Sequence, residues 1–123
     1  MEYSRDSTFN MGIAHLTRID ALLYDVADCA EREDYEGWHK SLNILSREVF
    51  FLFNETEMSE NAKKDNACAD AINKFKQERV YENKVNAYNC LVEYELFIKQ
   101  QLATRKMLMA FSKDLRVSIS DLS

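Results

Sequence analysis

The chain has no proline, and its 123 residues include only two glycines, Gly12 and Gly37. Folds rich in β-structure and loops that bind phosphate through glycine both depend on these residue types, because tight turns and close backbone approaches need them. Hydrophobic residues make up 46% of the chain and charged residues 30%, which is enough apolar material for a packed core. We therefore expect residues 1–123 to form a single all-α domain.

Apolar residues recur at helical spacing in four segments, which we predict to be helices at about 8–31, 35–54, 60–79 and 82–106. Ser7 is the expected N-cap of the first helix and Asp34 that of the second, since both side chains can accept hydrogen bonds from free amides. Residues 55–66 are the most polar stretch and are predicted to be a loop or a frayed helix start. A single helix from 60 to 106 would be roughly 70 Å long, so we place a bend near Tyr81. Together these segments predict an antiparallel four-helix bundle.

The periodicity changes after residue 106. Met107 to Phe111 form an apolar run, and Leu115, Val117 and Ile119 alternate with polar residues. A period of two is typical of an extended segment with one buried face. We expect residues 107–123 to be an extended tail or short strand that lies on the body of the protein or crosses to a partner, because a lone strand is unstable. The apolar run either anchors this tail to the core or forms an adaptable binding surface.

Charge and cysteine content exclude several classes of function. Residues 1–61 carry 5 Lys and Arg against 13 Asp and Glu, whereas residues 62–123 carry 11 against 8. The basic residues form no concentrated face, so nucleic-acid binding is not expected. No apolar run approaches the roughly 20 residues of a membrane span, and no signal peptide is apparent. Three widely spaced cysteines, Cys29, Cys68 and Cys90, indicate reduced and mostly buried thiols in a cytoplasmic protein.

One spacing is compatible with a metal site. Glu36 and His39 form the Glu-x-x-His pattern of di-iron bundles, and Glu93 is a candidate third ligand. Trp38 and Leu42 mark the inward face of the same helix, from which His39 is turned by about 80° and Glu36 by about 140°. We therefore expect no metal, no cofactor and no catalytic residue, with these three side chains as the candidates should a metal bind.

The main hypothesis rests on two predicted helices that carry more apolar side chains than one buried stripe per helix can hold. A helix in a four-helix monomer buries about a third to a half of its circumference, and the second and fourth predicted helices are apolar well beyond that. The excess is larger than the few hundred Å² of apolar patch that a monomer usually exposes. We therefore predict a two-fold homodimer. Its predicted interface residues are Ile44, Phe50, Phe51, Phe53, Tyr94 and Phe97. The alternative is a monomer whose third helix and tail cover the excess.

Two resemblances bear on function. Ala21-Leu22-Leu23-Tyr24-Asp25, the acidic link, Asp34-Tyr35-Glu36-Gly37-Trp38 and Leu42-Asn43-Ile44-Leu45 together resemble the first helical hairpin of flagellar export chaperones. That resemblance implies a small bundle that holds an unfolded partner. The whole chain is similar to small helical proteins of unassigned function from viruses and mobile elements, through the segments 34–42, 88–102 and 107–114. That second resemblance implies no catalytic residue, and in a virus the protein would act in the host cytoplasm.

Three function hypotheses follow from these observations. The first is a non-enzymatic interaction or structural accessory protein that acts as a homodimer. The second is a helical chaperone or adaptor that holds a partner's amphipathic segment in a groove. The third is a metal-dependent protein that uses the carboxylates and the histidine named above.

Overall fold

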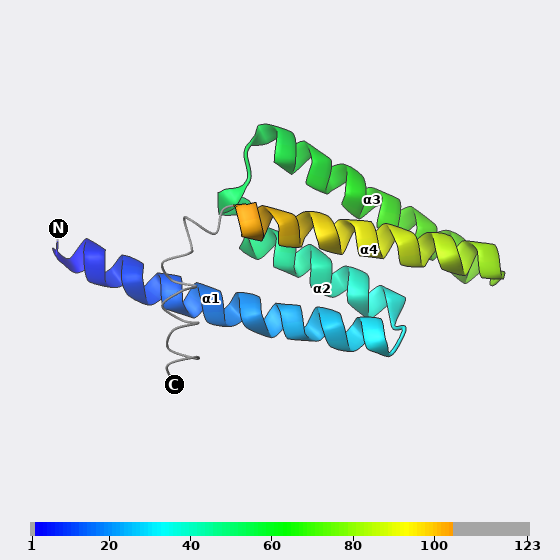
Figure 1. The fold of residues 1–123 in the computed structure, drawn as a ribbon, viewed down its shortest axis with the longest axis horizontal. Coiled ribbons are helices and arrows are strands. Elements are labelled where there is room, and N and C mark those ends of the chain that lie inside the picture. Colours follow the sequence, from blue (N-terminus) through cyan, green and yellow to red (C-terminus); the bar gives the residue numbers. More distant parts are fainter. Residues whose placement is uncertain (1, 105–123) are drawn as a thin grey trace.

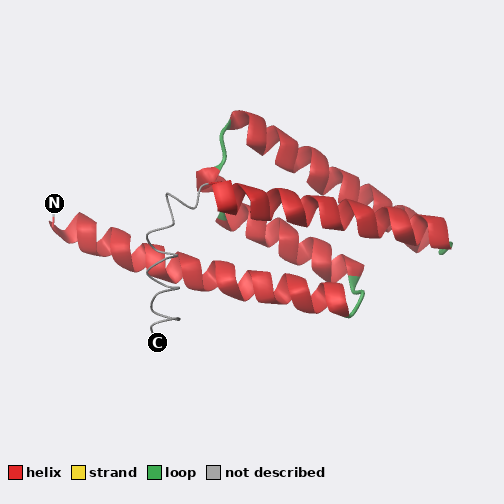
Figure 2. Cartoon of the chain, in the orientation of Figure 1, coloured by secondary structure: helices red, strands yellow, loops and turns green. Residues whose placement is uncertain are grey.

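The computed structural model of the protein describes the backbone of residues 2–104 and the side chains of residues 16–103. It contains helices α1 (Glu2–Glu31), α2 (Tyr35–Glu48), α3 (Glu55–Gln77) and α4 (Tyr81–Thr104), with a short 3-10 turn η1 (Phe50–Leu52) after α2 (Figures 1 and 2). Between residues 2 and 104 there is no strand, which confirms the all-α prediction. The predicted tail at 107–123 lies outside the described residues.

The α1–α2 connection is formed as the sequence predicts. Asp34 accepts a hydrogen bond from the backbone N–H of Gly37 at 3.0 Å and so caps α2. Glu33 adopts a positive φ of 57°, which reverses the chain within a few residues. α1 itself begins at Glu2, so the predicted start after Ser7 was too late. No proline or glycine lies between residues 2 and 11, so nothing in this segment stops the helix from continuing through Ser7.

The start of α3 corrects the prediction for residues 55–66, which are helical rather than a loop. Asn54 was expected to end the second helix, but it is the N-cap of α3. Its side chain accepts a hydrogen bond from Glu57 N at 2.8 Å, and the Glu57 carboxylate accepts one from Asn54 N at 3.0 Å. This reciprocal capping box begins α3 at Glu55, while α2 ends at Glu48 and continues only as η1.

The predicted bend near Tyr81 is confirmed, because α3 ends at Gln77 and α4 begins at Tyr81. No proline or glycine breaks the chain there. Instead, the side-chain amide of Asn83 donates a hydrogen bond to the backbone oxygen of Glu78 at 2.9 Å, and Asn83 is buried. A side chain that bonds the preceding backbone in this way competes with continuation of the helix.

The helices are arranged around α2. α3 packs along α4, both contact α2, and α1 packs along α2. Among the described residues, α1 makes no comparable packing with α3 or α4. α1 has 30 residues and α2 has 14, so at 1.5 Å per residue the first half of α1 extends past the end of α2 (Figure 1).

The core lies between α2, α3 and α4, with one face of α1 closing it. α2 contributes Trp38 and Leu42, which confirms their predicted inward orientation. Further fully buried side chains on the four helices are Val26, Leu45, Val49, Cys68, Leu91, Tyr94 and Ile98. In the part of the chain that the structure describes, none of the helices combines the length and the apolar character that crossing a bilayer requires.

Candidate functional site

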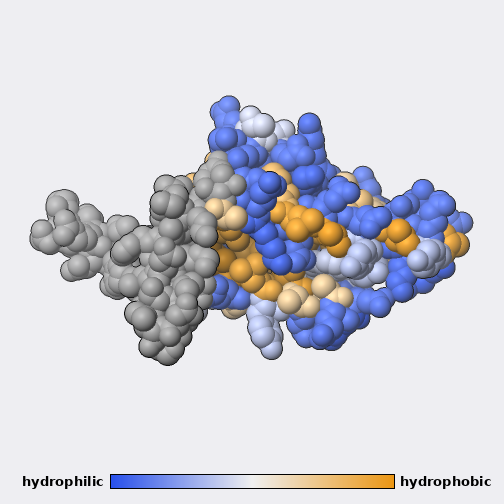
Figure 3. Space-filling view, in the orientation of Figure 1, coloured by the Kyte–Doolittle hydropathy of each residue, from blue (hydrophilic) through white to orange (hydrophobic). Residues whose placement is uncertain are grey.

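The outward side of α4 is apolar over about three turns. Tyr88 is 47% exposed and Leu96 is 59% exposed, while Val85 and Val92 are half-buried. At 100° per residue these four side chains fall within an arc of about 80°, opposite the buried Tyr94. Figure 3 shows apolar surface gathered on this side of the bundle, over α4 and between α4 and α1. We call these four residues the α4 outer face.

Contacts from α2 hold one edge of the α4 outer face in place. The indole of Trp38 donates a hydrogen bond to Glu95 Oε1 at 2.9 Å, and its ring meets the edge of the Tyr88 ring with centroids 5.6 Å apart. Lys99 binds the other carboxylate oxygen of Glu95 at 2.7 Å. Because Tyr88 and Glu95 are positioned by a buried tryptophan, the face is ordered before any partner binds.

A second apolar surface, which we call the α1 rim, lies along one edge of α1. Leu23 and Ala30 are half-buried and pack at the margin of the core, on the same stripe as the buried Ile19 and Val26. Within the described residues α1 packs along α2 and makes no comparable packing with α4, so the rim and the α4 outer face belong to two helices that both contact α2.

The structure corrects the predicted dimer interface at two residues. Tyr94 is completely buried and Phe97 is 9% exposed, so both belong to the core of the single chain. Contacts between helices cover both rings: Tyr94 bonds to Ser46 of α2, and Phe97 packs on Phe53 and under the ammonium group of Lys64 of α3. The α4 outer face was not identified as a unit, although its 3-4-4 spacing at residues 85, 88, 92 and 96 is visible once the buried positions are set aside.

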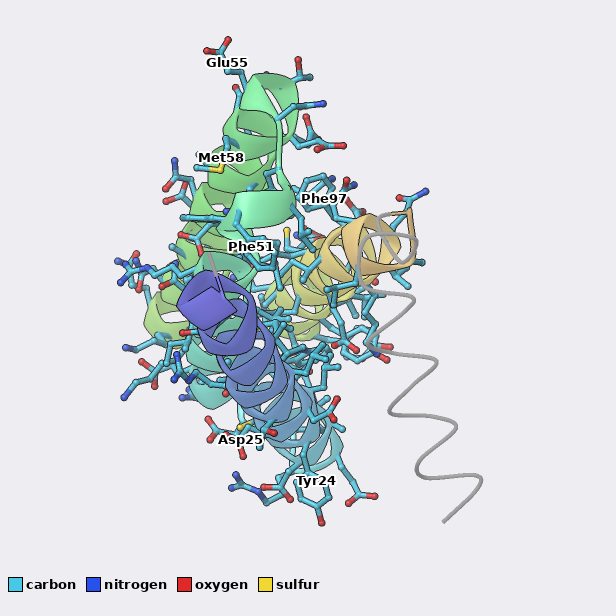
Figure 4. All side chains as sticks on the ribbon, turned by 90° about the vertical axis from the view of Figure 1, so that its left-hand side faces the viewer. Tyr24, Asp25, Phe51, Glu55, Met58 and Phe97 are labelled. Carbon is cyan, nitrogen blue, oxygen red and sulfur yellow. The ribbon has the colours of Figure 1, made fainter. Side chains whose placement is uncertain are left out.

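The other four predicted interface residues differ in exposure. Phe50 and Phe53 are half-buried and pack against each other with centroids 5.8 Å apart. Ile44 is 38% exposed and Phe51 is 64% exposed. Figure 4 looks at the bundle from the end where α3 begins and shows Phe51 there, with Met58 of α3 above it.

A polar network crosses the core between α2, α3 and α4. Tyr94 donates a hydrogen bond to Ser46 Oγ at 3.1 Å, and Ser46 donates one to the backbone oxygen of Asn43 at 2.8 Å. Asp65 of α3 accepts a hydrogen bond from the Asn43 side chain at 3.1 Å and is paired with His39 Nε2 at 2.9 Å. Burial raises the pKa of Tyr94, so its hydroxyl stays neutral and acts as a hydrogen-bond donor. Such a network fixes the register of the three helices.

The candidate metal ligands are not brought together. Glu36 binds Lys76 at 2.7 Å, His39 is paired with Asp65, and Glu93 is exposed on α4. No group of three or more His, Cys, Asp or Glu side chains within the described side chains is arranged to hold a metal ion. The Glu-x-x-His spacing therefore places its two residues in separate contacts that join α2 to α3, a salt bridge from Glu36 to Lys76 and a hydrogen bond between His39 and Asp65.

A shallow, open depression of about 170 Å³ lies between α2 and α3. Its lining residues are Glu36, His39, Lys40, Ala69, Ile72 and Asn73. The volume is below the roughly 300 Å³ at which small-molecule sites begin, and two of its polar groups, Glu36 and His39, are already engaged by Lys76 and Asp65 of α3. We therefore do not assign a ligand to it.

The three cysteines are free thiols, as the sequence predicts. Cys29 and Cys68 are buried and Cys90 is half-buried. Burial raises the pKa of Cys68 to about 12, and its thiol donates a hydrogen bond to the backbone oxygen of Cys90 at 3.2 Å. A thiol with so high a pKa is not a nucleophile near neutral pH, so Cys68 is a packing residue.

No family model, curated protein or solved structure matches the chain. The resemblances to flagellar export chaperones and to viral helical proteins therefore stay predictions from short motifs. What the chain can do is argued below from the exposed and buried side chains of its own helices.

Proposed function

We propose that the protein is a non-enzymatic helical interaction protein that acts as a homodimer in the cytoplasm, in a structural or accessory role of the kind found in viruses and mobile elements. The observation that carries the proposal is the α4 outer face, where Tyr88 and Leu96 are both about half exposed. Apolar surface in water costs about 25 cal/mol per Å², so association that covers this face is favourable.

The polar side chains of the core support a binding role rather than a catalytic one. His39 is engaged by Asp65 and Tyr94 by Ser46, so each has a structural partner. The exposed side chains of Glu36 on α2 and Lys76 on α3 bind each other. The α4 outer face, by contrast, keeps much of its apolar surface exposed in the single chain, and a partner would cover that surface.

Sedimentation velocity of the full 123-residue chain tests the proposal. The expected result is a species of twice the 14.4 kDa chain mass that dissociates on dilution. Leu96→Glu is expected to weaken the dimer at least about tenfold, because it places a charge at a buried apolar contact. Gln100→Glu adds the same charge one turn further along α4 at an exposed position outside the face, and it should leave the dimer intact. A single-copy particle at every concentration would overturn the homodimer.

A helical chaperone or adaptor is the second candidate, and one observation favours it. α1 and α4 both lie on α2 without packing along each other, so an amphipathic helix of a partner could lie between the α1 rim and the α4 outer face. This function predicts a monomer that binds the dye 1-anilinonaphthalene-8-sulfonate, with binding reduced by Leu23→Glu on the rim. A dimer that does not bind the dye contradicts it.

A further inference from the structure

We propose that two copies pair through their α4 helices, antiparallel, with the two-fold axis at Val92. The inference rests on the homodimer proposed above and specifies its interface. Tyr88 and Leu96 are the two most exposed residues of the α4 outer face, and each lies four positions from Val92. An antiparallel pairing centred there places Tyr88 of one copy on Leu96 of the other, and the two-fold axis repeats that contact.

The same register gives the two charged residues next to the centre, Glu95 and Lys99, compatible partners. Val85 falls opposite Lys99, whose aliphatic stem can cover the valine while Glu95 holds its ammonium group at 2.7 Å. Glu95 falls opposite the neutral Asn89. No two like charges therefore oppose each other along the central part of the helix.

Parallel pairing of the same face is disfavoured by charge. It would set each residue against its own copy, so Lys99 would face Lys99 and Glu95 would face Glu95. Like charges placed opposite each other in an interface cost several kcal/mol. The distribution of charge on α4 thus selects the antiparallel orientation.

The α4 outer face is also the better choice among the exposed apolar residues. Ile44 stands between Lys40 and Arg47 on the same side of α2, all three exposed, so it is a single apolar side chain flanked by cations and not part of a continuous apolar face. Tyr88, by contrast, is held by Trp38, and this fixed ring loses little freedom when a leucine packs on it. A second copy of this chain supplies that leucine.

Disulfide cross-linking of the full-length chain tests the geometry. In a Cys90→Ala background, which removes the half-buried native thiol, Val92→Cys should link to its own copy when oxidised with copper phenanthroline and oxygen. Tyr88→Cys alone and Leu96→Cys alone should stay unlinked, whereas an equal mixture of the two should form the mixed dimer. The background protein without an added cysteine is the matched control.

Each result decides one part of the proposal. Self-linking of Val92→Cys together with the mixed dimer supports the two-fold axis. Self-linking of both Tyr88→Cys and Leu96→Cys indicates a parallel pair and overturns it. A protein that sediments as a dimer but gives no Val92→Cys link overturns the α4 geometry and leaves the homodimer standing. A protein that sediments as a monomer overturns both the α4 geometry and the homodimer.

Discussion

The indole N–H of Trp38 on α2 donates a hydrogen bond to Glu95 Oε1 on α4 at 2.9 Å. The indole is buried, and the carboxylate that receives its bond is largely covered as well. A hydrogen bond from a buried donor to a charged acceptor is worth more than one on the surface, because neither group has water as an equal alternative. This pair therefore fixes how α4 lies on α2, and with it the orientation of the α4 outer face.

Replacing Trp38 with phenylalanine removes the donor and part of the ring. We expect Trp38→Phe to lower the free energy of unfolding by about 2–4 kcal/mol, from the lost hydrogen bond and the volume left behind. Glu95→Gln keeps an acceptor oxygen and loses the ion pair with the exposed Lys99, so it should cost under about 1 kcal/mol. Urea titrations followed by far-UV circular dichroism measure both values. If the two variants were equally stable, the hydrogen bond would not be the main contact between these helices.

The N-cap of α3 gives a second prediction. Asn54→Ala removes the acceptor for Glu57 N, and we expect a loss of about 0.5–2 kcal/mol in unfolding free energy. Asn54→Asp keeps an acceptor at the positive end of the helix and should be close to wild type. Hydrogen exchange should show that the first turn of α3, from Glu55, loses protection in Asn54→Ala and keeps it in Asn54→Asp. Unchanged protection in both would mean that packing alone holds this turn.

The helix caps and the break between α3 and α4 show how much of the fold can be predicted from the sequence. Asp34 and the Tyr81 break were predicted correctly, because a cap before an apolar run and a limit on helix length are local signals. The α3 start differs from the prediction because the polar composition of residues 55–66 is typical of a loop, whereas Asn54-x-x-Glu57 has the spacing of a capping box that begins a helix. Polar residues suit a helix that buries only a narrow stripe.

The candidate site was predicted less well than the fold, and tertiary packing is the reason. Exposure depends on which helix covers which side, and the sequence does not show that α3 covers Tyr94 and Phe97 while α1 leaves α4 uncovered. Similarly, Glu36 and His39 satisfy a metal-ligand spacing, but their partners Lys76 and Asp65 come from another helix. Spacing along one helix identifies candidate residues, and contacts between helices decide their roles.

Alkaline pH is expected to destabilise the fold through Cys68. Burial raises the pKa of this thiol from 9.0 to about 12, so folding favours the neutral form. The stabilisation that this buried thiol gives the fold is fully present below pH 9, where the thiol is also protonated in the unfolded chain. It is lost as the pH rises from 9 towards 12. The unfolding free energy should fall by up to about 1.4 kcal/mol per pH unit in that window.

Two variants separate this effect from general alkaline unfolding. Cys68→Ala should reduce the slope above pH 9, while its stability at pH 7 falls through the lost thiol packing and the lost hydrogen bond to the Cys90 backbone oxygen. Tyr94, whose pKa burial also raises from 10.0, adds a further loss above pH 10, and Tyr94→Phe should remove that part. Urea unfolding at pH 7, 9, 10 and 11 measures the slopes. A wild-type stability that stayed constant to pH 11 would contradict the burial of both groups.

Gly37 sits where a side chain has no room, and this gives the last prediction. A Cβ atom at this position would collide with the Asp34 carboxylate that caps α2 and would lie 3.0 Å from Cys29 Sγ. Alanine favours the helix over glycine by about 1 kcal/mol of free energy. The substitution therefore gains helix propensity but disturbs the Asp34 cap. The Asp34 side chain can move aside, but it then loses its bond to Gly37 N, which is worth about 0.5–2 kcal/mol. We expect Gly37→Ala to be destabilising by about 1 kcal/mol in the wild-type background, because the crowding at Cys29 adds to the lost cap.

In an Asp34→Ala background the cap is already gone, so Gly37→Ala should be close to neutral. A double-mutant cycle of unfolding free energies measures this coupling, and simple additivity of the two substitutions would show that the carboxylate and the missing Cβ do not compete for the same space.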